Sequence, residues 1–356
     1  MALQKDNDLI LDLKNVNVRF NVEDGQLHIL RDVSLSVPRG SFLCVVGESG
    51  CGKSVTAQAI VQLLPDNGQI SDGEILFRDG DELIKLNTLE KFGRQMRGLR
   101  GAKIGMIFQE PMTALNPVFT VGRQLTEGLR VHRGLSRPEA RTRALELLTQ
   151  VRIPEPERRL NQYPHELSGG MRQRVVIAMA LACEPRLLIA DEPTTALDVT
   201  VQKEVLALIR QLVAEDGMGL LLISHDLGLM RDQVERVMVM YGGAVVESAP
   251  TKALFGMRAH PYSQGLFAAR PQLGLKRGTR LQTIAGNVPE IFNWPQGCAF
   301  ADRCAYVQDN CRQTVPQLEL VPDTADVIDD KVADKPRRVD AHWVRCPEWQ
   351  KLEASA

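Results

Sequence analysis

Residues 41–60 read SFLCVVGESGCGKSVTAQAI, and this stretch decides the fold. Its centre, Gly47-Glu-Ser-Gly-Cys-Gly-Lys53-Ser54, fits the pattern G-x-x-x-x-G-K-[ST] between an apolar run and a helical run, which is the strand–loop–helix setting of a phosphate-binding loop. The glycines allow backbone N–H groups to approach phosphate oxygens, Lys53 adds a mobile positive charge, and Ser54 offers a hydroxyl to Mg²⁺. The stretch therefore predicts a nucleotide-binding α/β domain.

A second motif ends in two adjacent carboxylates. Residues 187–192 read Leu-Leu-Ile-Ala-Asp-Glu, an apolar run that stops at Asp191 and Glu192. The carboxyl ends of strands in α/β sheets are where ligands bind. Asp191 is suited to holding Mg²⁺ through water, and Glu192 to acting as the general base that polarises an attacking water.

Other apolar runs organise the chain around these motifs. Residues 103–108, 186–190 and 219–224 are nearly continuous apolar runs, which is typical of parallel strands covered on both faces. Residues 236–248 predict a hairpin that turns at Gly242 and Gly243. Between Gln109 and Ser168 the spacing of the apolar residues becomes helical, and Ser136-Arg-Pro-Glu139 is a capping box at a helix start. We therefore expect a sheet domain interrupted by a helical insert at about 111–180.

Composition limits the possible partners of the chain. It has 356 residues, 43 basic and 44 acidic side chains and a formal net charge of −1, so charge does not indicate a nucleic acid or an anionic membrane as partner. The apolar runs are far shorter than the ~18–20 residues that span a bilayer, and the N-terminus does not resemble a signal peptide. We expect a cytosolic chain whose membrane role, if any, needs a spanning partner.

A third motif carries a family resemblance. Leu167-Ser168-Gly169-Gly170-Met-Arg-Gln173, together with the other two motifs, resembles the nucleotide-binding subunits of ABC transporters over about residues 9–250. The resemblance implies a P-loop NTPase (RecA-like) nucleotide-binding domain with a helical signature subdomain, which binds ATP and Mg²⁺. It implies an ATPase in which Ser168-Gly-Gly faces the γ-phosphate held by a second subunit, so that ATP joins a head-to-tail dimer and hydrolysis releases it.

The resemblance also assigns roles to individual residues. The catalytic residues are Glu192, the switch histidine His225 and Gln109 of the glutamine loop; Phe20 stacks on adenine; and Asp198 lies in the D-loop. The Mg²⁺ ligands are Ser54, Gln109 and Asp191. The full expected nucleotide-binding set is Phe20, Gly47, Glu48, Ser49, Gly50, Cys51, Gly52, Lys53, Ser54, Gln109, Asp191, Ser168, Gly169, Gly170, Gln173 and Asp198.

The end of the chain narrows the family. His260-Pro-Tyr-Ser-Gln-Gly-Leu-Phe-Ala-Ala-Arg-Pro271 and Gly286-Asn-Val-Pro289 resemble the dipeptide/oligopeptide permease ATPases, and residues 171–200 resemble the D-type subunit of that group. This implies an importer of peptides or a related solute (nickel, opines, oligosaccharides), and the sequence does not choose among them because this subunit does not touch the solute. The implied partners are a homologous F-type ATPase subunit, two transmembrane permease subunits and, indirectly, a solute-binding protein, at the cytoplasmic face of the plasma membrane. We divide the chain into domains 1–255 and 256–356.

Four cysteines near the end of the chain indicate a metal. Cys298, Cys304, Cys311 and Cys346 follow the spacing C-x₅-C-x₆-C-x₃₄-C. In a reducing compartment a metal site is favoured over disulfides, and the paired C-x₂₋₄-C knuckles of structural zinc are missing from this spacing. The looser spacing favours a [4Fe–4S] cluster that staples a small domain. Zinc, with His342 replacing one cysteine, and unmetallated thiols are the alternatives.

Two other function classes fit the nucleotide motifs. A soluble ABC ATPase of repair or translation would be expected to carry two cassettes, a long coiled coil or a basic patch. A metal-sensing regulatory module would have a vestigial ATPase, yet Glu192 and His225 keep their functional residue types.

Overall fold

The computed structural model describes residues 8–109, 114–195, 197–226, 228, 231, 233–269, 283–290, 292, 294–322 and 341–353. The chain forms two compact units, each assembled from separate segments. The first unit contains Met1–Leu11, Val37–Phe42 and Leu76–Ser224, and the second contains Asp12–Ser36, Leu43–Ile75 and His225–Ala356. In the part of the chain that is described, no helix combines the length and the apolar character needed to cross a bilayer.

Three parallel strands form the core of the first unit. β6 (Ile104–Ile107) pairs with β7 (Leu187–Asp191), and β7 pairs with β8 (Gly219–Ser224). Every residue of β7 and β8 is buried. Burial on both faces is what the continuous apolar runs predicted, and the parallel order brings the carboxyl ends of all three strands to one edge.

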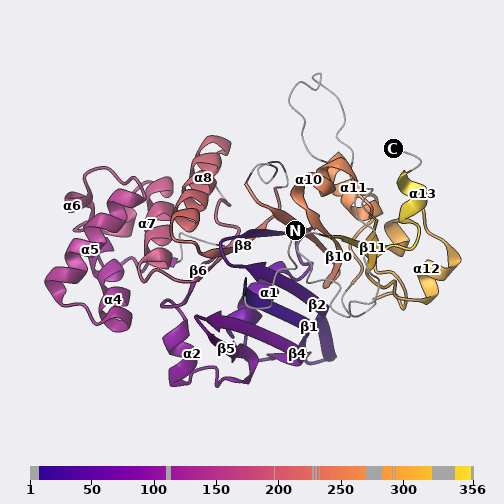
Figure 1. The fold of residues 1–356 in the computed structure, drawn as a ribbon, viewed down its shortest axis with the longest axis horizontal. Helices are drawn as coiled ribbons and strands as arrows, with labels where there is room; N and C mark the ends of the chain where they lie inside the picture. The colour runs from indigo at the N-terminus through magenta and orange to yellow at the C-terminus, as the bar shows by residue number, and fades with distance from the viewer. Residues whose placement is uncertain are drawn as a thin grey trace. The chain divides into compact units, whose positions relative to one another are not determined.

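Helices of the first unit gather into one bundle. α4 (Val121–Arg133), α5 (Arg137–Gln150), α6 (Pro156–Arg159) and α7 (Gly169–Leu181) lie together (Figure 1). The expected capping box is present at the start of α5, and α7 packs on both α4 and β6. The remaining elements of this unit are β5 (Glu82–Lys85), η2 (Leu86–Thr88), α2 (Arg94–Leu99), η3 (Pro164–Glu166) and α8 (Val199–Glu215).

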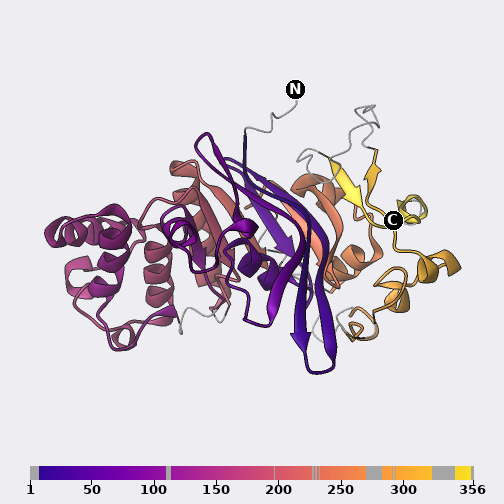
Figure 2. The same cartoon turned by 90° about the horizontal axis from the view of Figure 1, so that it is seen from below.

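In the second unit a parallel strand pair continues into an antiparallel series. β3 (Phe42–Val46) runs parallel to β9 (Arg236–Tyr241), and β9 pairs with β10 (Ala244–Pro250) through the expected hairpin. β12 (His342–Val344) then pairs with both β10 and β11 (Glu319–Val321), and Figure 2 shows β11 and β12 side by side in yellow. β10 is thereby paired with a strand that lies almost one hundred positions further along the chain.

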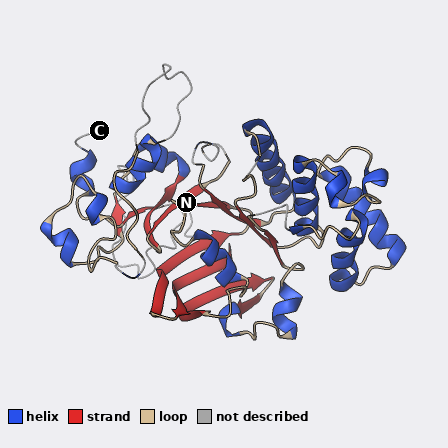
Figure 3. Cartoon of the chain, turned by 180° about the vertical axis from the view of Figure 1, so that it is seen from behind, coloured by secondary structure: helices blue, strands red, loops and turns tan. Residues whose placement is uncertain are grey.

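Long strands and short helices complete the structure. β1 (Leu9–Val22), β2 (Gly25–Pro38), β4 (Gly68–Asp79) and β5 form a four-stranded sheet in the order β2-β1-β4-β5 (Figure 3). The helices of the second unit are α1 (Lys53–Ile60), α10 (Thr251–Gly256), α11 (Pro261–Ala268), η5 (Ala301–Arg303), α12 (Asp309–Gln313) and α13 (Trp349–Glu353).

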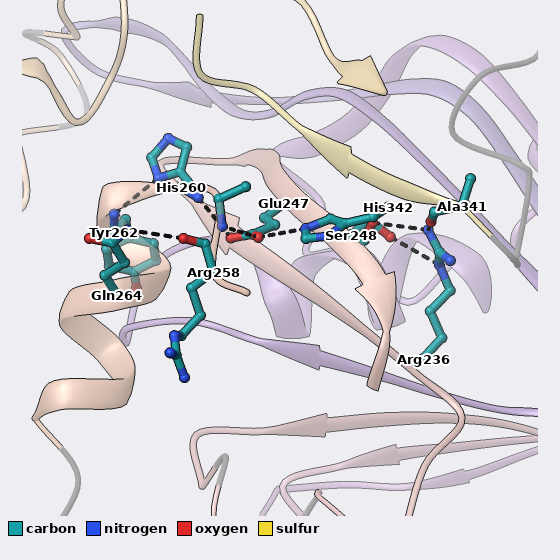
Figure 4. Close-up of polar contacts among 10 residues, drawn as sticks. Arg236, Glu247, Ser248, Arg258, His260, Tyr262, Gln264, Ala341 and His342 are labelled. Atoms are coloured by element: carbon teal, nitrogen blue, oxygen red, sulfur yellow. Dashed lines mark hydrogen bonds and ion pairs between the residues drawn. The ribbon is translucent and has the colours of Figure 1, made fainter. Parts of the chain in front are cut away.

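A buried carboxylate joins β10 to the segments that follow it. Glu247 is 0% exposed and accepts hydrogen bonds from Ala259 N (2.7 Å), His260 N (3.1 Å) and His342 Nε2 (2.7 Å) (Figure 4). Burial lowers the pKa of His260 to about 4, and its unprotonated Nδ1 accepts from Tyr262 N at 3.0 Å. The carboxylate is therefore fully partnered, as a buried charge must be.

The replacement Glu247→Ala is expected to destabilise the protein by about 3–5 kcal/mol, because it leaves two backbone donors and His342 buried without an acceptor. Glu319→Ala on β11 is the control, since its side chain is exposed; a change within about 0.5 kcal/mol is expected there. Urea unfolding at neutral pH measures both. Equal stabilities of the two variants would contradict the role of Glu247.

Candidate functional site

The glycine-rich loop lies between β3 and α1 in the second unit. Lys53, at the start of α1, is 5% exposed and its Nζ donates to Gly47 O (2.9 Å) and Glu48 O (3.0 Å). The ammonium group therefore lies over the first residues of the loop. A cation held there, next to a helix N-terminus, favours an anion such as a phosphate.

Two glycines of this loop are required by its geometry. A Cβ at Gly47 would lie 2.3 Å from the carbonyl oxygen of Met240, a backbone atom that cannot move aside. Gly52 has φ +100°, in the region that favours glycine, and a Cβ there would meet the Leu30 side chain at 2.6 Å. The residue types recognised in the sequence are therefore imposed by close packing of the loop against β9 and β2.

Acidic and amide side chains meet at the strand ends of the first unit. Asp191, the last residue of β7, is 4% exposed. Glu192 follows at φ 47° and its Oε2 accepts from Gln109 Nε2 (3.4 Å) and Thr195 Oγ1 (2.9 Å). Gln109 comes two residues after β6, so the parallel order explains why it reaches Glu192. Thr195 begins the stretch Thr195–Asp198 that resembles the D-loop, but its contact with Glu192 was not predicted from the sequence.

The third sequence motif, Leu167–Gln173, lies at the start of α7 in the first unit. Ser168 is its N-cap, with Oγ accepting from Met171 N at 3.3 Å, and Ser168 and Gly169 are exposed. An exposed helix N-terminus of this kind presents unpaired N–H groups to an anion. Gln173, also on α7, differs because its side chain is buried. Its Nε2 and Oε1 have no hydrogen-bond partner among the described residues. It does not share the exposed face of Ser168.

The other predicted nucleotide residues divide between the two units. Asp198, in the first, caps α8 by accepting from Thr200 N and Val201 N, both at 3.0 Å. In the second unit, Phe20 on β1 is half-buried with its ring against Gly68, and His225 is exposed just after β8. Gly47–Ser54 share this second unit, whereas Gln109, Ser168–Gln173, Asp191 and Glu192 belong to the first.

The four late cysteines line one cavity in the second unit. Cys298, Cys304, Cys311 and Cys346 share it with residues that include Phe300. Burial, together with neighbouring thiols, raises the pKa of the Cys298, Cys304 and Cys346 thiols, to about 12 for Cys346. Among the described residues no disulfide joins them, and no three acidic, histidine or cysteine side chains are arranged to hold a metal ion.

His342 does not line the cysteine cavity. Its Nε2 donates to Glu247 Oε1 on β10, and both side chains are buried. The expectation that His342 replaces a cysteine as zinc ligand therefore conflicts with its position, because β12 directs it to a carboxylate that needs its proton. No local sequence signal distinguishes a histidine with this role from a ligand, since the two residues are 95 positions apart.

Comparisons with known proteins match both halves of the chain. The family described as ABC transporter matches residues 30–195, and the family described as Oligopeptide/dipeptide transporter, C-terminal region, matches residues 246–311. A putative peptide import ATP-binding protein of Brucella melitensis is 46% identical over 97% of this chain and 98% of its own length. The dipeptide transport ATP-binding protein DppD of Bacillus subtilis is 46% identical over 88% of this chain and 92% of its own.

Solved structures resemble the chain over about two thirds of its length. The ATP-binding cassette MJ0796, solved as a dimer in a post-hydrolysis state bound to ADP and phosphate, has a TM-score of 0.60 and 32% identity, and the match covers 68% of this chain and 98% of that one. The cbiO1 protein of Clostridium perfringens, part of the ABC transporter complex cbiONQ, has a TM-score of 0.58 and 29% identity over 70% and 91%.

The replacement Lys53→Ala is expected to weaken ATP binding by about 10- to 100-fold, because it removes the charge next to the loop that would meet the phosphates. Lys252→Ala, at an exposed position of α10, is the matched control. Equilibrium binding of a fluorescent ATP analogue measures both. Unchanged affinity in Lys53→Ala would exclude the loop as the phosphate site.

Proposed function

The chain belongs to the family of ABC transporter ATP-binding subunits, and from that premise we propose that it hydrolyses ATP to power an importer of peptides or a related small solute. The observation that carries the proposal is the succession of two matched families in one chain, the ABC transporter family at 30–195 and the oligopeptide/dipeptide C-terminal region at 246–311. Relatives of nearly equal length are named peptide import and dipeptide transport ATP-binding proteins.

We further propose the division of labour at the nucleotide. The loop Gly47–Ser54 binds the phosphates through its backbone N–H groups and Lys53, and Phe20 stacks on adenine. Glu192 accepts the proton of the attacking water while Gln109, within 3.4 Å of it, orients that water together with the magnesium site. His225 contacts the γ-phosphate. Ser168, Gly169 and Gly170 complete the ATP site of a second subunit. Asp198 makes contact with that second subunit.

The oxygen donors of this set suit Mg²⁺. Ser54 supplies a hydroxyl, Gln109 an amide oxygen and Asp191 a carboxylate, which are the hard ligands that Mg²⁺ prefers. When bound, the ion neutralises charge between the β- and γ-phosphates.

The same proposal covers the assembly. Residues 1–255 form the ATP-binding domain and 256–356 the extension, and the partners are a homologous F-type ATPase subunit, two permease subunits and an external solute-binding protein. The chain then lies peripherally at the cytoplasmic face of the plasma membrane, bound to the permease subunits. A repair or translation ATPase is less well supported, since the match at 246–311 is to a transporter region.

We also propose that the cysteine cavity holds a [4Fe–4S] cluster, with zinc as the alternative. Four thiols line one small cavity, which supports the proposal, and thiolates are the ligands that iron–sulfur clusters use. Four neighbouring thiolates, two of them buried, would repel one another, so a multivalent cation is what would allow them to ionise together. The described side chains would need new rotamers to enclose a cluster, because none is arranged around a metal now.

The replacement Glu192→Gln is expected to lower the rate of ATP hydrolysis by about 10²- to 10⁴-fold while ATP remains bound, because an amide cannot accept the proton of water. Glu204→Gln, which only weakens an exposed ion pair with Arg174, is the control. Phosphate release and dimerisation with ATP are measured on the assembled transporter. Hydrolysis at the wild-type rate by Glu192→Gln would refute the assignment.

Protein purified without oxygen is expected to be brown and to contain about four iron atoms per chain. Cys298→Ser and Cys311→Ser are expected to lose the iron, whereas Cys183→Ser, outside the cavity, keeps it. Elemental analysis and the visible spectrum measure this. Stoichiometric zinc in colourless protein would select the alternative metal, and absence of both metals would reject the metal proposal.

A further inference from the structure

The segment that carries two of the cavity cysteines also contacts the phosphate loop. Arg303 lies one residue before Cys304, and its guanidinium donates to both carboxylate oxygens of Glu48, from Nη1 to Oε2 at 2.7 Å and from Nη2 to Oε1 at 3.1 Å. Glu48 is the second residue of the phosphate loop. All of these residues belong to the second unit. Two parallel bonds of this kind fix orientation as well as distance.

The guanidinium of Arg303 is itself held in place. Its Nε donates to Ala285 O at 2.9 Å and its Nη1 to the hydroxyl of Tyr241 at 3.3 Å, and the group lies near the rings of Tyr241 and Phe300. The side chain is only 4% exposed, and its hydrogen bonds to Glu48 raise its pKa. This arginine therefore differs from a mobile surface ion pair, which contributes little.

A second contact fixes the backbone of Glu48. Its N–H donates to the hydroxyl of Tyr262 at 2.7 Å, while its carbonyl accepts from Lys53 Nζ at 3.0 Å. The ring of Tyr262 packs against Tyr241 and Phe300 at centroid distances of 4.6 and 5.4 Å. The Gly47–Glu48 peptide group, whose carbonyl oxygen is one acceptor of Lys53, is thus oriented by Tyr262 from the C-terminal part of the chain.

The same short segment forms the wall of the cysteine cavity. Cys298, Phe300, Ala301 and Cys304 line it, whereas Arg303 of the same segment bonds Glu48. Phe300 contacts both the cavity and the aromatic pair that supports the phosphate loop. Residues 298–304 therefore connect the wall of the cysteine cavity to the guanidinium that holds the loop.

We propose that Arg303 is a positioning residue for ATP binding, which holds the phosphate loop through Glu48. This rests on the proposed role of Gly47–Ser54 as the phosphate site. Arg303 does not reach the nucleotide in this scheme; it sets the orientation of the Glu48 peptide and of the Lys53 ammonium that does.

A double-mutant cycle on the full chain tests the proposal. Arg303→Met and Glu48→Gln are each expected to raise the dissociation constant of an ATP analogue by about tenfold, as expected when a charge-assisted hydrogen bond is lost. The double variant is expected to bind no worse than the weaker single variant, because both replacements remove one interaction. The matched control is Arg312→Met, which loses an exposed ion pair with Asp302 in the same segment.

Kinetics of the assembled transporter separate positioning from general damage. A displaced loop is expected to raise the KM for ATP with little change in kcat, whereas loss of folded protein would lower kcat and leave KM unchanged. If Arg303→Met fails to fold, Glu48→Gln, whose side chain is 29% exposed, still gives the KM and binding values. Wild-type affinity in both single variants, or additive effects in the double variant, would overturn the proposal.

Lys53→Ala in the same binding assay distinguishes this inference from the function on which it rests. If Lys53→Ala loses ATP and the Arg303 and Glu48 variants do not, the phosphate site stands and the positioning role is rejected. If Lys53→Ala binds ATP normally, the phosphate site itself is wrong, and the positioning role is rejected with it.

Discussion

The parallel pairing of β3 with β9 is the contact on which the second unit depends. Its register pairs Val46 with Val239. The phosphate loop therefore begins at Gly47 next to Met240 of β9, whose carbonyl oxygen leaves no room for a Cβ at Gly47. The next residue of β9, Tyr241, supports the guanidinium of Arg303, and the hairpin after it leads to β10 and Glu247. This one strand register thus positions the phosphate loop, the ring of Tyr241 and the carboxylate of Glu247.

Two acidic side chains tie distant parts of the chain together in different ways. Glu247 is fully buried and its partners include two backbone N–H groups, so it works as a structural joint whose removal leaves several donors unpaired. Glu48 is partly exposed and has a dedicated arginine. Glu48 therefore contributes less to the free energy of unfolding than Glu247 does. Its partner Arg303 instead fixes the orientation of the loop that we propose to bind the phosphates.

Local pattern predicted the elements and failed at long-range polar contacts. The apolar runs identified β6, β7 and β8, and Ser136 with Glu139 identified the start of α5, because period and capping are properties of neighbouring residues. Arg303 and Glu48 are 255 positions apart, and Tyr262 lies 214 from the same glutamate. The role of Gln173 at the nucleotide stays a prediction; its side chain is buried, which helical spacing alone does not predict.

The cysteine cavity, which we propose as a metal site, also takes part in ordinary packing. Cys346 belongs to an apolar cluster with Val344 and Trp349, so the end of the chain has a small core of its own and is not held by thiols alone. Burial holds the pKa values of Cys298, Cys304 and Cys346 above the usual value, so the proposed metal would have to displace protons to bind. Replacing Cys346 would disturb packing and ligation together. Cys298, which lies outside that cluster and begins the segment leading to Arg303, is the position where a serine separates the two effects.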